Sequence, residues 1–161
     1  MNSPHDSQGM SLIVKTVCGW VKGFILLYGI HIMLYGHLTP GGGFAGGVIA
    51  ATAFVLIMLA EGEQAAAKTL SRKAASTWGN LGVLLFWLMA MLGVSVAGIF
   101  FINFRTTPES ARLTLFSGGI IPYCDIGISL MVCGSLYLVA QMLTAHGLSS
   151  DRGGKSEEDT A

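Results

Sequence analysis

Residues 35–60 read YGHLTPGGGFAGGVIAATAFVLIMLA, a proline and a glycine cluster followed by a long apolar run. Gly41, Gly43 and Gly46 match the spacing G-x-G-x-x-G, which binds a dinucleotide when it joins a strand to a helix. Glu61 lies twenty residues after Gly41, where such proteins place an acid for the ribose. The stretch is therefore either a nucleotide loop or a turn that needs glycine for another reason.

The residues around the glycines argue against a nucleotide loop. The chain has 161 residues, is 52% hydrophobic and only 11% charged, whereas an ordinary soluble domain has about 25% charged residues. Its apolar residues gather in runs, each long enough to cross a hydrocarbon core, which takes about 20 residues. The four runs cover residues 12–36, 43–60, 80–102 and 120–143. The glycines thus lie between two apolar spans, and a βαβ unit is absent from this pattern.

A soluble four-helix bundle is the alternative explanation for four apolar runs. Helices of such a bundle carry polar residues on one face, at every third or fourth position. Residues 82–103, GVLLFWLMAMLGVSVAGIFFIN, have only Ser95 as a polar residue between their ends. This helix is apolar all round, so the sequence predicts an all-α membrane protein with four transmembrane helices.

The distribution of positive charge predicts the orientation. With four spans, both termini and the loop between the second and third spans share one side of the membrane. Seven basic residues lie on that side: Lys15, Lys22, Lys68, Arg72, Lys73, Arg152 and Lys155. The other side has Arg105 and Arg112. The positive-inside rule therefore predicts a multi-pass protein of the cell (inner) membrane with N and C termini cytoplasmic.

The polar ends divide the chain into three parts. We expect a polar N-terminal tail at residues 1–11, a four-helix membrane domain at 12–145, and a disordered polar C-terminal tail at 146–161. The formal net charge is zero, so the sequence favours no nucleic-acid partner. The lipid bilayer is the expected surrounding of the membrane domain.

The glycine stretch predicts a tight turn between the first two spans. Pro40 cannot continue a helix and restrains Thr39 to an extended conformation. Gly41 and Gly42 allow the backbone to turn through positive φ.

Small residues then recur at every fourth position of the second span, in two rows. The rows are Gly43, Gly47 and Ala51, and Gly42, Gly46 and Ala50. Such faces let another helix approach closely in lipid, so we expect a partner helix within this chain or in another protein of a complex. The predicted turn and packing residues are Pro40, Gly41, Gly42, Gly43, Phe44, Gly46, Gly47 and Pro122.

Two motifs resemble a known family. GHLTPGGGFAGG at residues 36–47 resembles the signature of the MnhB family, the MnhB subunits of Mrp-type Na+/H+ antiporters, whose module also occurs in related membrane-bound hydrogenases. FSGGIIPYCDIG at 116–127 resembles the second glycine-proline motif of that family. The likeness covers residues 12–145. It implies other antiporter or hydrogenase subunits as partners, with ion conduction largely in the larger subunits.

The chain departs from the family at two positions in the fourth span. The family commonly has an asparagine where this chain has Asp125, and a lysine where it has Met131. The basic residue that the resemblance implies inside this span is therefore missing.

Ionisable residues inside spans are functional candidates, because they are costly in lipid. Asp125 either relays ions at the outer mouth or caps the helix start by bonding free backbone N–H groups. His31 either bonds a neighbouring helix or relays a proton, and His37 is expected to cap its helix or bond the glycine turn. Lys22 snorkels to the headgroups, points into a polar interior, or pairs with an acid of a partner subunit. Asp125, His31, Lys22 and His37 are thus the ion-path candidates.

Other polar residues are interpreted as structural. We expect Glu61 and Glu63 to be solvated loop acids, and the three cysteines to be packing residues, since their spacing matches no metal motif. No arrangement resembles a catalytic triad or a metal cage. The sequence therefore predicts no catalytic site, no cofactor and no metal, and no enzymatic activity of this chain by itself.

The leading functional prediction is a membrane subunit of a multisubunit monovalent cation (Na+)/proton antiporter, with a structural and passage-lining role. The alternative is the same module in an energy-converting hydrogenase or a related complex I-like ion-pumping oxidoreductase. A third possibility is a self-standing homo-oligomeric channel or transporter. Neighbouring genes would separate the first two, and transport by the purified chain alone would indicate the third.

Overall fold

The computed structural model describes residues 12–38, 40–103 and 118–158, and the regular secondary structure in these ranges is helical. Its helices are α1 (Leu12–Leu34), α2 (Gly42–Glu61), α3 (Glu63–Thr69), α4 (Arg72–Ala97) and α5 (Ile121–Glu158). Four of these are long and apolar enough to cross a membrane: Ile13–Leu34, Gly42–Glu61, Arg72–Val96 and Ile121–Ala145. The predicted all-α fold with four spans is confirmed.

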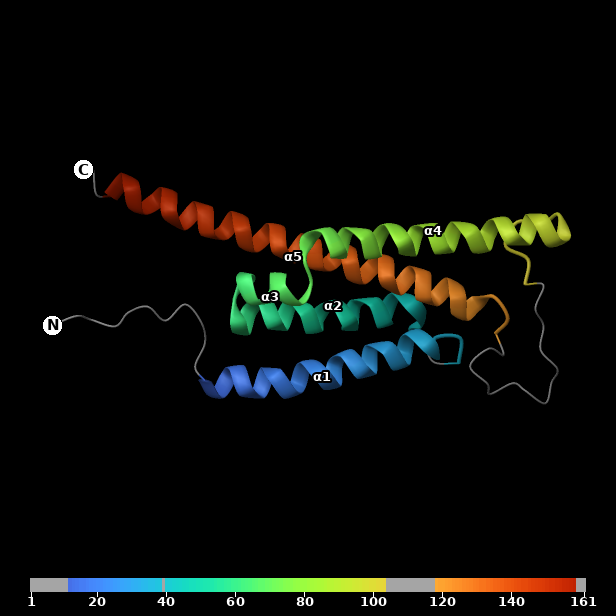
Figure 1. Cartoon of the computed structure of the whole chain (residues 1–161), viewed down its shortest axis with the longest axis horizontal. Helices are drawn as coiled ribbons and strands as arrows, with labels where there is room; N and C mark the ends of the chain where they lie inside the picture. The colour runs from blue at the N-terminus through green and yellow to red at the C-terminus, as the bar shows by residue number, and fades with distance from the viewer. Residues whose placement is uncertain (1–11, 39, 104–117, 159–161) are drawn as a thin grey trace.

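The long helices lie side by side in the order α1, α2, α5, α4 (Figure 1). Helix α2 packs against α1 on one side and α5 on the other, and α5 also packs against α4. We call the end that carries the α1–α2 turn and the start of α5 the turn end. The opposite end, with the start of α1 and with α3, is the terminal end (Figure 1). Which side of a membrane each end faces stays a prediction.

Both small-residue rows of α2 pack within the chain. A Cβ on Gly47 would lie 2.6 Å from the Ser129 carbonyl oxygen of α5, so the two backbones nearly touch. A Cβ on Gly46 would lie 2.9 Å from the Met33 nitrogen of α1. One row thus receives α5 and the other receives α1, which answers the question of partner left open by the sequence.

Helices α4 and α5 approach in the same way. A Cβ on Gly134 would lie 3.0 Å from the Gly79 nitrogen, and one on Gly127 would lie 3.0 Å from the Gly82 oxygen. Close backbone approach compensates for the absence of a hydrophobic drive between helices in lipid.

The turn between α1 and α2 uses glycine where the backbone requires it. Gly41 and Gly42 have φ of 124° and 60°, conformations that other residues adopt at a cost. Gly41 is the N-cap residue of α2 and offers no side-chain cap. The N-terminus of α2 therefore has free backbone N–H groups that need acceptors from elsewhere. Thr39, expected to be extended, lies outside the described residues.

The helix boundaries differ from the apolar runs at α4. The helix begins at Arg72 rather than Asn80, because the Ser71 hydroxyl accepts a hydrogen bond from the Ala74 N–H (3.2 Å) and caps it there. It ends at Ala97, since Gly98 adopts the left-handed conformation with φ 70°. The polar loop before it also contains the short helix α3.

The C-terminal segment also differs from expectation. We expected residues 146–161 to be disordered, but α5 continues as a helix to Glu158. Extending an existing helix avoids the cost of nucleation, and no proline interrupts this segment. The N-terminal tail, 1–11, lies outside the described residues.

Candidate functional site

Asp125 lies at the turn end, where α5 meets the start of α2. Its Oδ1 accepts a hydrogen bond from the Gly43 backbone N–H at 3.2 Å. Gly43 is in the first turn of α2, where N–H groups have no acceptor within the helix and the dipole favours negative charge. The sequence suggested that Asp125 bonds free N–H groups at the start of its own helix. In the structure the capped helix is α2.

The second carboxylate oxygen of Asp125 has a different environment. Oδ2 is buried and accepts no hydrogen bond from the part of the chain that the structure describes. A Cβ on Gly36 would lie 2.7 Å from this oxygen, so only glycine leaves room for the carboxylate. The sequence analysis did not single out Gly36, although it opens the glycine motif.

His37 connects the two glycine motifs. Its ring packs against Gly118, where an added Cβ would lie 3.1 Å from ring atoms Cγ and Cδ2. Asn103 stabilises the same segment: its Nδ2 donates to the Gly118 carbonyl (3.0 Å), and its Oδ1 accepts from the Ile120 N–H (3.3 Å). The motifs that carry the family resemblance, far apart in sequence, therefore meet at the turn end.

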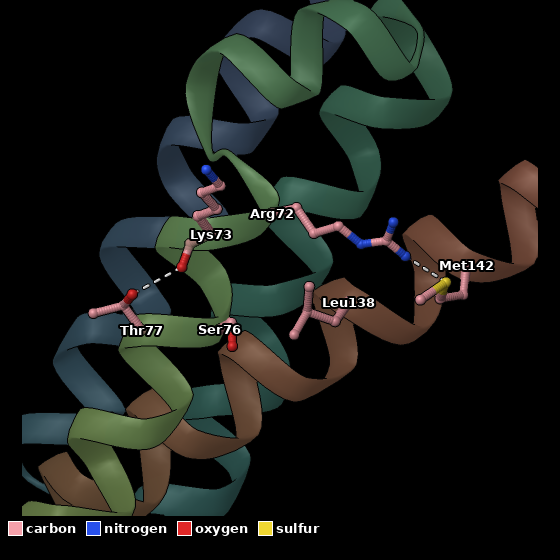
Figure 2. A pocket seen from close by; sticks show the side chains of 6 residues that line it. All are labelled: Arg72, Lys73, Ser76, Thr77, Leu138 and Met142. Carbon is pink, nitrogen blue, oxygen red and sulfur yellow. Dashed lines mark hydrogen bonds between the residues drawn. The ribbon is translucent and has the colours of Figure 1, made fainter.

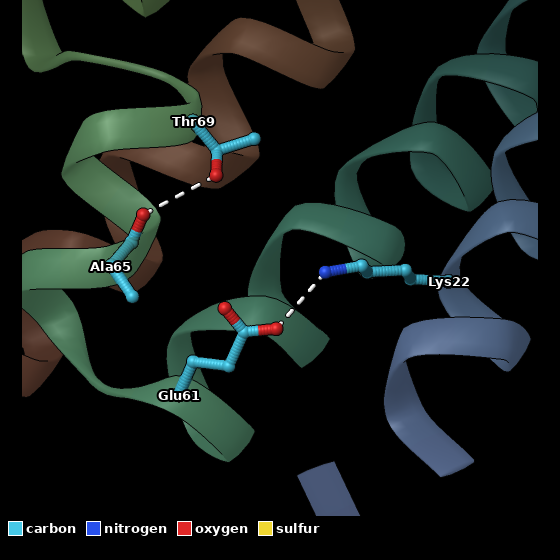
Figure 3. Close-up of polar contacts among 4 residues, drawn as sticks. All are labelled: Lys22, Glu61, Ala65 and Thr69. Atoms are coloured by element: carbon cyan, nitrogen blue, oxygen red, sulfur yellow. Dashed lines mark hydrogen bonds and ion pairs between the residues drawn. The ribbon is translucent and has the colours of Figure 1, made fainter. Parts of the chain in front are cut away.

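Lys22 forms an ion pair at the terminal end. Its Nζ lies 2.9 Å from Glu61 Oε1 on α2, and both side chains are 32% exposed (Figure 3). The acid that Lys22 meets is therefore in its own chain. Our interpretation of Glu61 as a solvated loop acid was wrong, because Glu61 is the last residue of α2 and faces α1.

A buried polar network joins α5 to the segment before α4. The Tyr137 hydroxyl is fully buried; it donates to the Leu70 carbonyl (2.9 Å) and accepts from Gln141 Nε2 (3.0 Å). Leu70 follows α3, so its carbonyl oxygen has no acceptor role inside a helix. The sequence analysis missed this network. The only signal was a tyrosine and a glutamine four residues apart in an apolar span, which places them on one helix face.

His31 points away from the bundle. It is exposed, its ring lies 4.9 Å from that of Tyr35, and it lines a groove on α1 together with Phe24, Leu27 and Tyr28. These residues follow the i, i+3, i+4, i+7 spacing of one helix face. Within the described ranges, His31 thus bonds no other helix of the bundle, and it shares no site with His37.

These groups form separate centres. Asp125 and His37 lie at the turn end, Lys22 lies at the terminal end, and His31 lies on the outward face of α1. In the described ranges, no three His, Cys, Asp or Glu residues lie close enough to hold a metal ion. The arrangement fixes helices to one another and offers ionisable groups at both ends of the bundle.

Taken together, four long apolar helices with few charges define a multi-pass integral membrane protein. Residues 13–138 match the family described as "Domain related to MnhB subunit of Na+/H+ antiporter". The chain belongs to this family.

Curated relatives agree over shorter or partial regions. The uncharacterized protein MJ1307 of Methanocaldococcus jannaschii is 31% identical over 150 residues, which cover 91% of this chain and 57% of that protein. The B-type subunit of the Na(+)/H(+) antiporter of Bacillus subtilis is 39% identical over 56 residues, 35% of this chain and 39% of that protein. Putative antiporter subunit mnhB2 of Staphylococcus saprophyticus is 43% identical over 49 residues, 30% of this chain and 35% of that protein. The chain spans less than two thirds of the length of each.

Proposed function

We propose that this chain is a membrane subunit of a multisubunit Na+/H+ antiporter in the cell membrane, without enzymatic activity of its own. The observation that carries the proposal is the family match over residues 13–138, which includes most of the four-helix bundle. Relatives of this chain are named as antiporter subunits, which supports the same assignment here.

A structural role is supported by the way the bundle is built. The three helix interfaces rely on glycine contacts between backbones, which hold the helices in one register. The carboxylate of Asp125 and the ion pair of Lys22 are both engaged within the chain. Their contacts fix α5 and α1 to the two ends of α2. We therefore propose that Asp125 acts mainly as an anchor.

The outward face of α1 supports the presence of other subunits. Only 11% of the apolar part of α1 is buried in the chain, against 44% for α2. This face carries His31, and lipid tails offer no hydrogen bond to an imidazole. A neighbouring subunit would supply that partner and would cover the groove beside Phe24 and Leu27.

A passage-lining role concerns the same ionisable groups. Asp125, His31, Lys22 and His37 are the groups through which this chain would contact a hydrated path, at its two ends and on the α1 face. We propose that such a path runs along the boundary with a larger subunit, because these groups lie near the surface of the bundle rather than in one internal channel.

The test is purification of the complex through an affinity tag on this chain in a mild detergent, followed by identification of the copurifying proteins. The proposal requires other antiporter subunits in the preparation. Copurification of hydrogenase and iron–sulfur subunits would assign the chain to a redox-driven pump instead. Cation-dependent proton movement in vesicles that contain only this chain would contradict the subunit role.

A further inference from the structure

A groove lies between α4 and α5 at the terminal end, apart from the centres described above. It has a volume of about 650 Å3 and is lined by Arg72, Lys73, Ser76, Thr77, Leu138 and Met142. Figure 2 shows Arg72 extending from α4 across the gap toward Met142 on α5, with Ser76 and Leu138 between the two helices.

The positive charge of this groove lacks an acidic partner. Arg72 donates to the thioether sulfur of Met142, which is a weak acceptor. In the described chain the ion pair is Lys22–Glu61, so no carboxylate there pairs with Arg72 or Lys73. A guanidinium normally binds a carboxylate or a phosphate through two parallel hydrogen bonds. Arg72 is therefore available for an anion.

The neighbouring groups favour the same kind of ligand. Arg72 and Lys73 are the first two residues of α4, and the positive end of the helix dipole adds to their charge. The Ser76 hydroxyl is exposed and directed to the gap, whereas the Thr77 hydroxyl already donates to the Lys73 carbonyl at 2.9 Å. The wall formed by Leu138 and Met142 is apolar.

The position of the groove decides between a lipid and a soluble anion. Arg72 is the first residue of the span Arg72–Val96, so the polar part of the groove lies at the level of the lipid headgroups. The apolar wall belongs to the span of α5 and continues toward the hydrocarbon. A ligand that fits both parts has a phosphate at one end and hydrocarbon at the other.

We propose that this groove binds an anionic phospholipid of the leaflet at the terminal end. Arg72 leaves the Met142 sulfur and holds the phosphate, with the Ser76 hydroxyl as a second donor. Lys73, whose side chain points away from the gap in Figure 2, contributes mainly long-range charge. The acyl chains lie along Leu138 and Met142. Basic groups between membrane helices bind acidic headgroups in this way.

The experiment measures lipid retention by the purified full-length chain. The protein is exchanged into detergent with equal amounts of phosphatidylglycerol and phosphatidylcholine, and bound lipid is counted by native mass spectrometry. The wild type should retain phosphatidylglycerol selectively. Arg72→Gln should lower that retention by about fivefold, the effect expected for one basic residue near an anionic membrane surface, and Lys73→Gln by less. Arg72→Lys should be intermediate, because it keeps the charge but loses the two parallel bonds.

Lys68→Gln is the matched control, because Lys68 is an exposed cation of α3 at the same end and does not line the groove. It should leave lipid retention unchanged. Equal retention by Arg72→Gln and Lys68→Gln, both with wild-type helical content, would overturn the proposal. Displacement of the lipid by equimolar glycerol 3-phosphate or inorganic phosphate would assign the site to a soluble anion and would also overturn it.

Discussion

The Gly43 backbone N–H donates to Oδ1 of Asp125 at 3.2 Å, across 82 residues of sequence. An acid near the start of α5 thereby caps α2, and the carboxylate fits only because Gly36 and Gly43 have no side chains. The glycine motif of residues 36–47 and the acid of the second motif are thus parts of one joint. This relationship gives the motif a structural explanation that needs no nucleotide.

Asp125→Asn should retain assembly and transport, because an asparagine oxygen accepts the Gly43 hydrogen bond nearly as well. Asp125→Leu should lose that acceptor and leave the N–H unpaired, which costs about 1–3 kcal/mol. The two variants are compared by thermal unfolding in detergent and by sodium-driven proton movement in everted vesicles. An Asn variant that assembles normally but no longer transports would show that Asp125 relays ions.

Gly47→Leu should prevent correct packing of α2 on α5, because even a Cβ at this position would lie 2.6 Å from the Ser129 carbonyl oxygen. Overpacking of this kind typically costs about 1–3 kcal/mol, and more where backbone must move. Loss of the protein from the membrane fraction, or of its copurifying subunits, is the expected result.

Gly23→Leu is the control for this substitution. Gly23 is also helical, and a Cβ there would meet no atom within 4 Å. It should accumulate as the wild type does. Equal accumulation and transport of the Gly47 and Gly23 variants would mean that the α2–α5 contact is not required.

The sequence predicted the spans and the need for close packing, but not the pairing of the helices. Two rows of small residues on α2 are equivalent in spacing, so nothing local distinguishes the row that meets α1 from the row that meets α5. The role of Asp125 depended on the same information, since its proximity to a helix start was local but the identity of the capped helix was not. Glu61 was misread because a charge at the end of a span looks alike whether it faces water or a lysine on the next helix.

The ion pair of Lys22 and Glu61 should be visible in a double-mutant cycle. Lys22→Met and Glu61→Gln each leave one charge without its partner at the edge of the span, whereas the double variant removes both. We expect a coupling free energy of about 0.5–1 kcal/mol, as for partly exposed pairs. Thermal unfolding in detergent measures it, and additive effects of the two substitutions would mean that the pair contributes nothing.

The orientation rests on the asymmetry of lysine and arginine, and cysteine labelling tests it. In a background with the native cysteines replaced by alanine, Ser7→Cys and Ser156→Cys should be shielded from impermeant thiol reagents in intact cells. Ser110→Cys should react. Labelling at both termini without labelling at position 110 would reverse the predicted topology.

The outward face of α1 makes the last prediction. Phe24 and Leu27 line the groove beside His31, and Phe24 is 69% and Leu27 66% exposed in the isolated chain. If another subunit covers this groove, a photo-crosslinking amino acid at position 27 should form a protein adduct in native membranes. Thr52, an exposed residue of α2 whose hydroxyl bonds its own helix, provides a comparison position on another helix. His31→Leu should weaken copurification, because the partner's hydrogen-bonding group would then face an apolar side chain, and the cost of such an unpaired group is about 1–3 kcal/mol. Adducts at position 27 with lipid alone, together with unchanged copurification of the His31→Leu variant, would show that this face is lined by the bilayer and that the subunit contacts lie elsewhere.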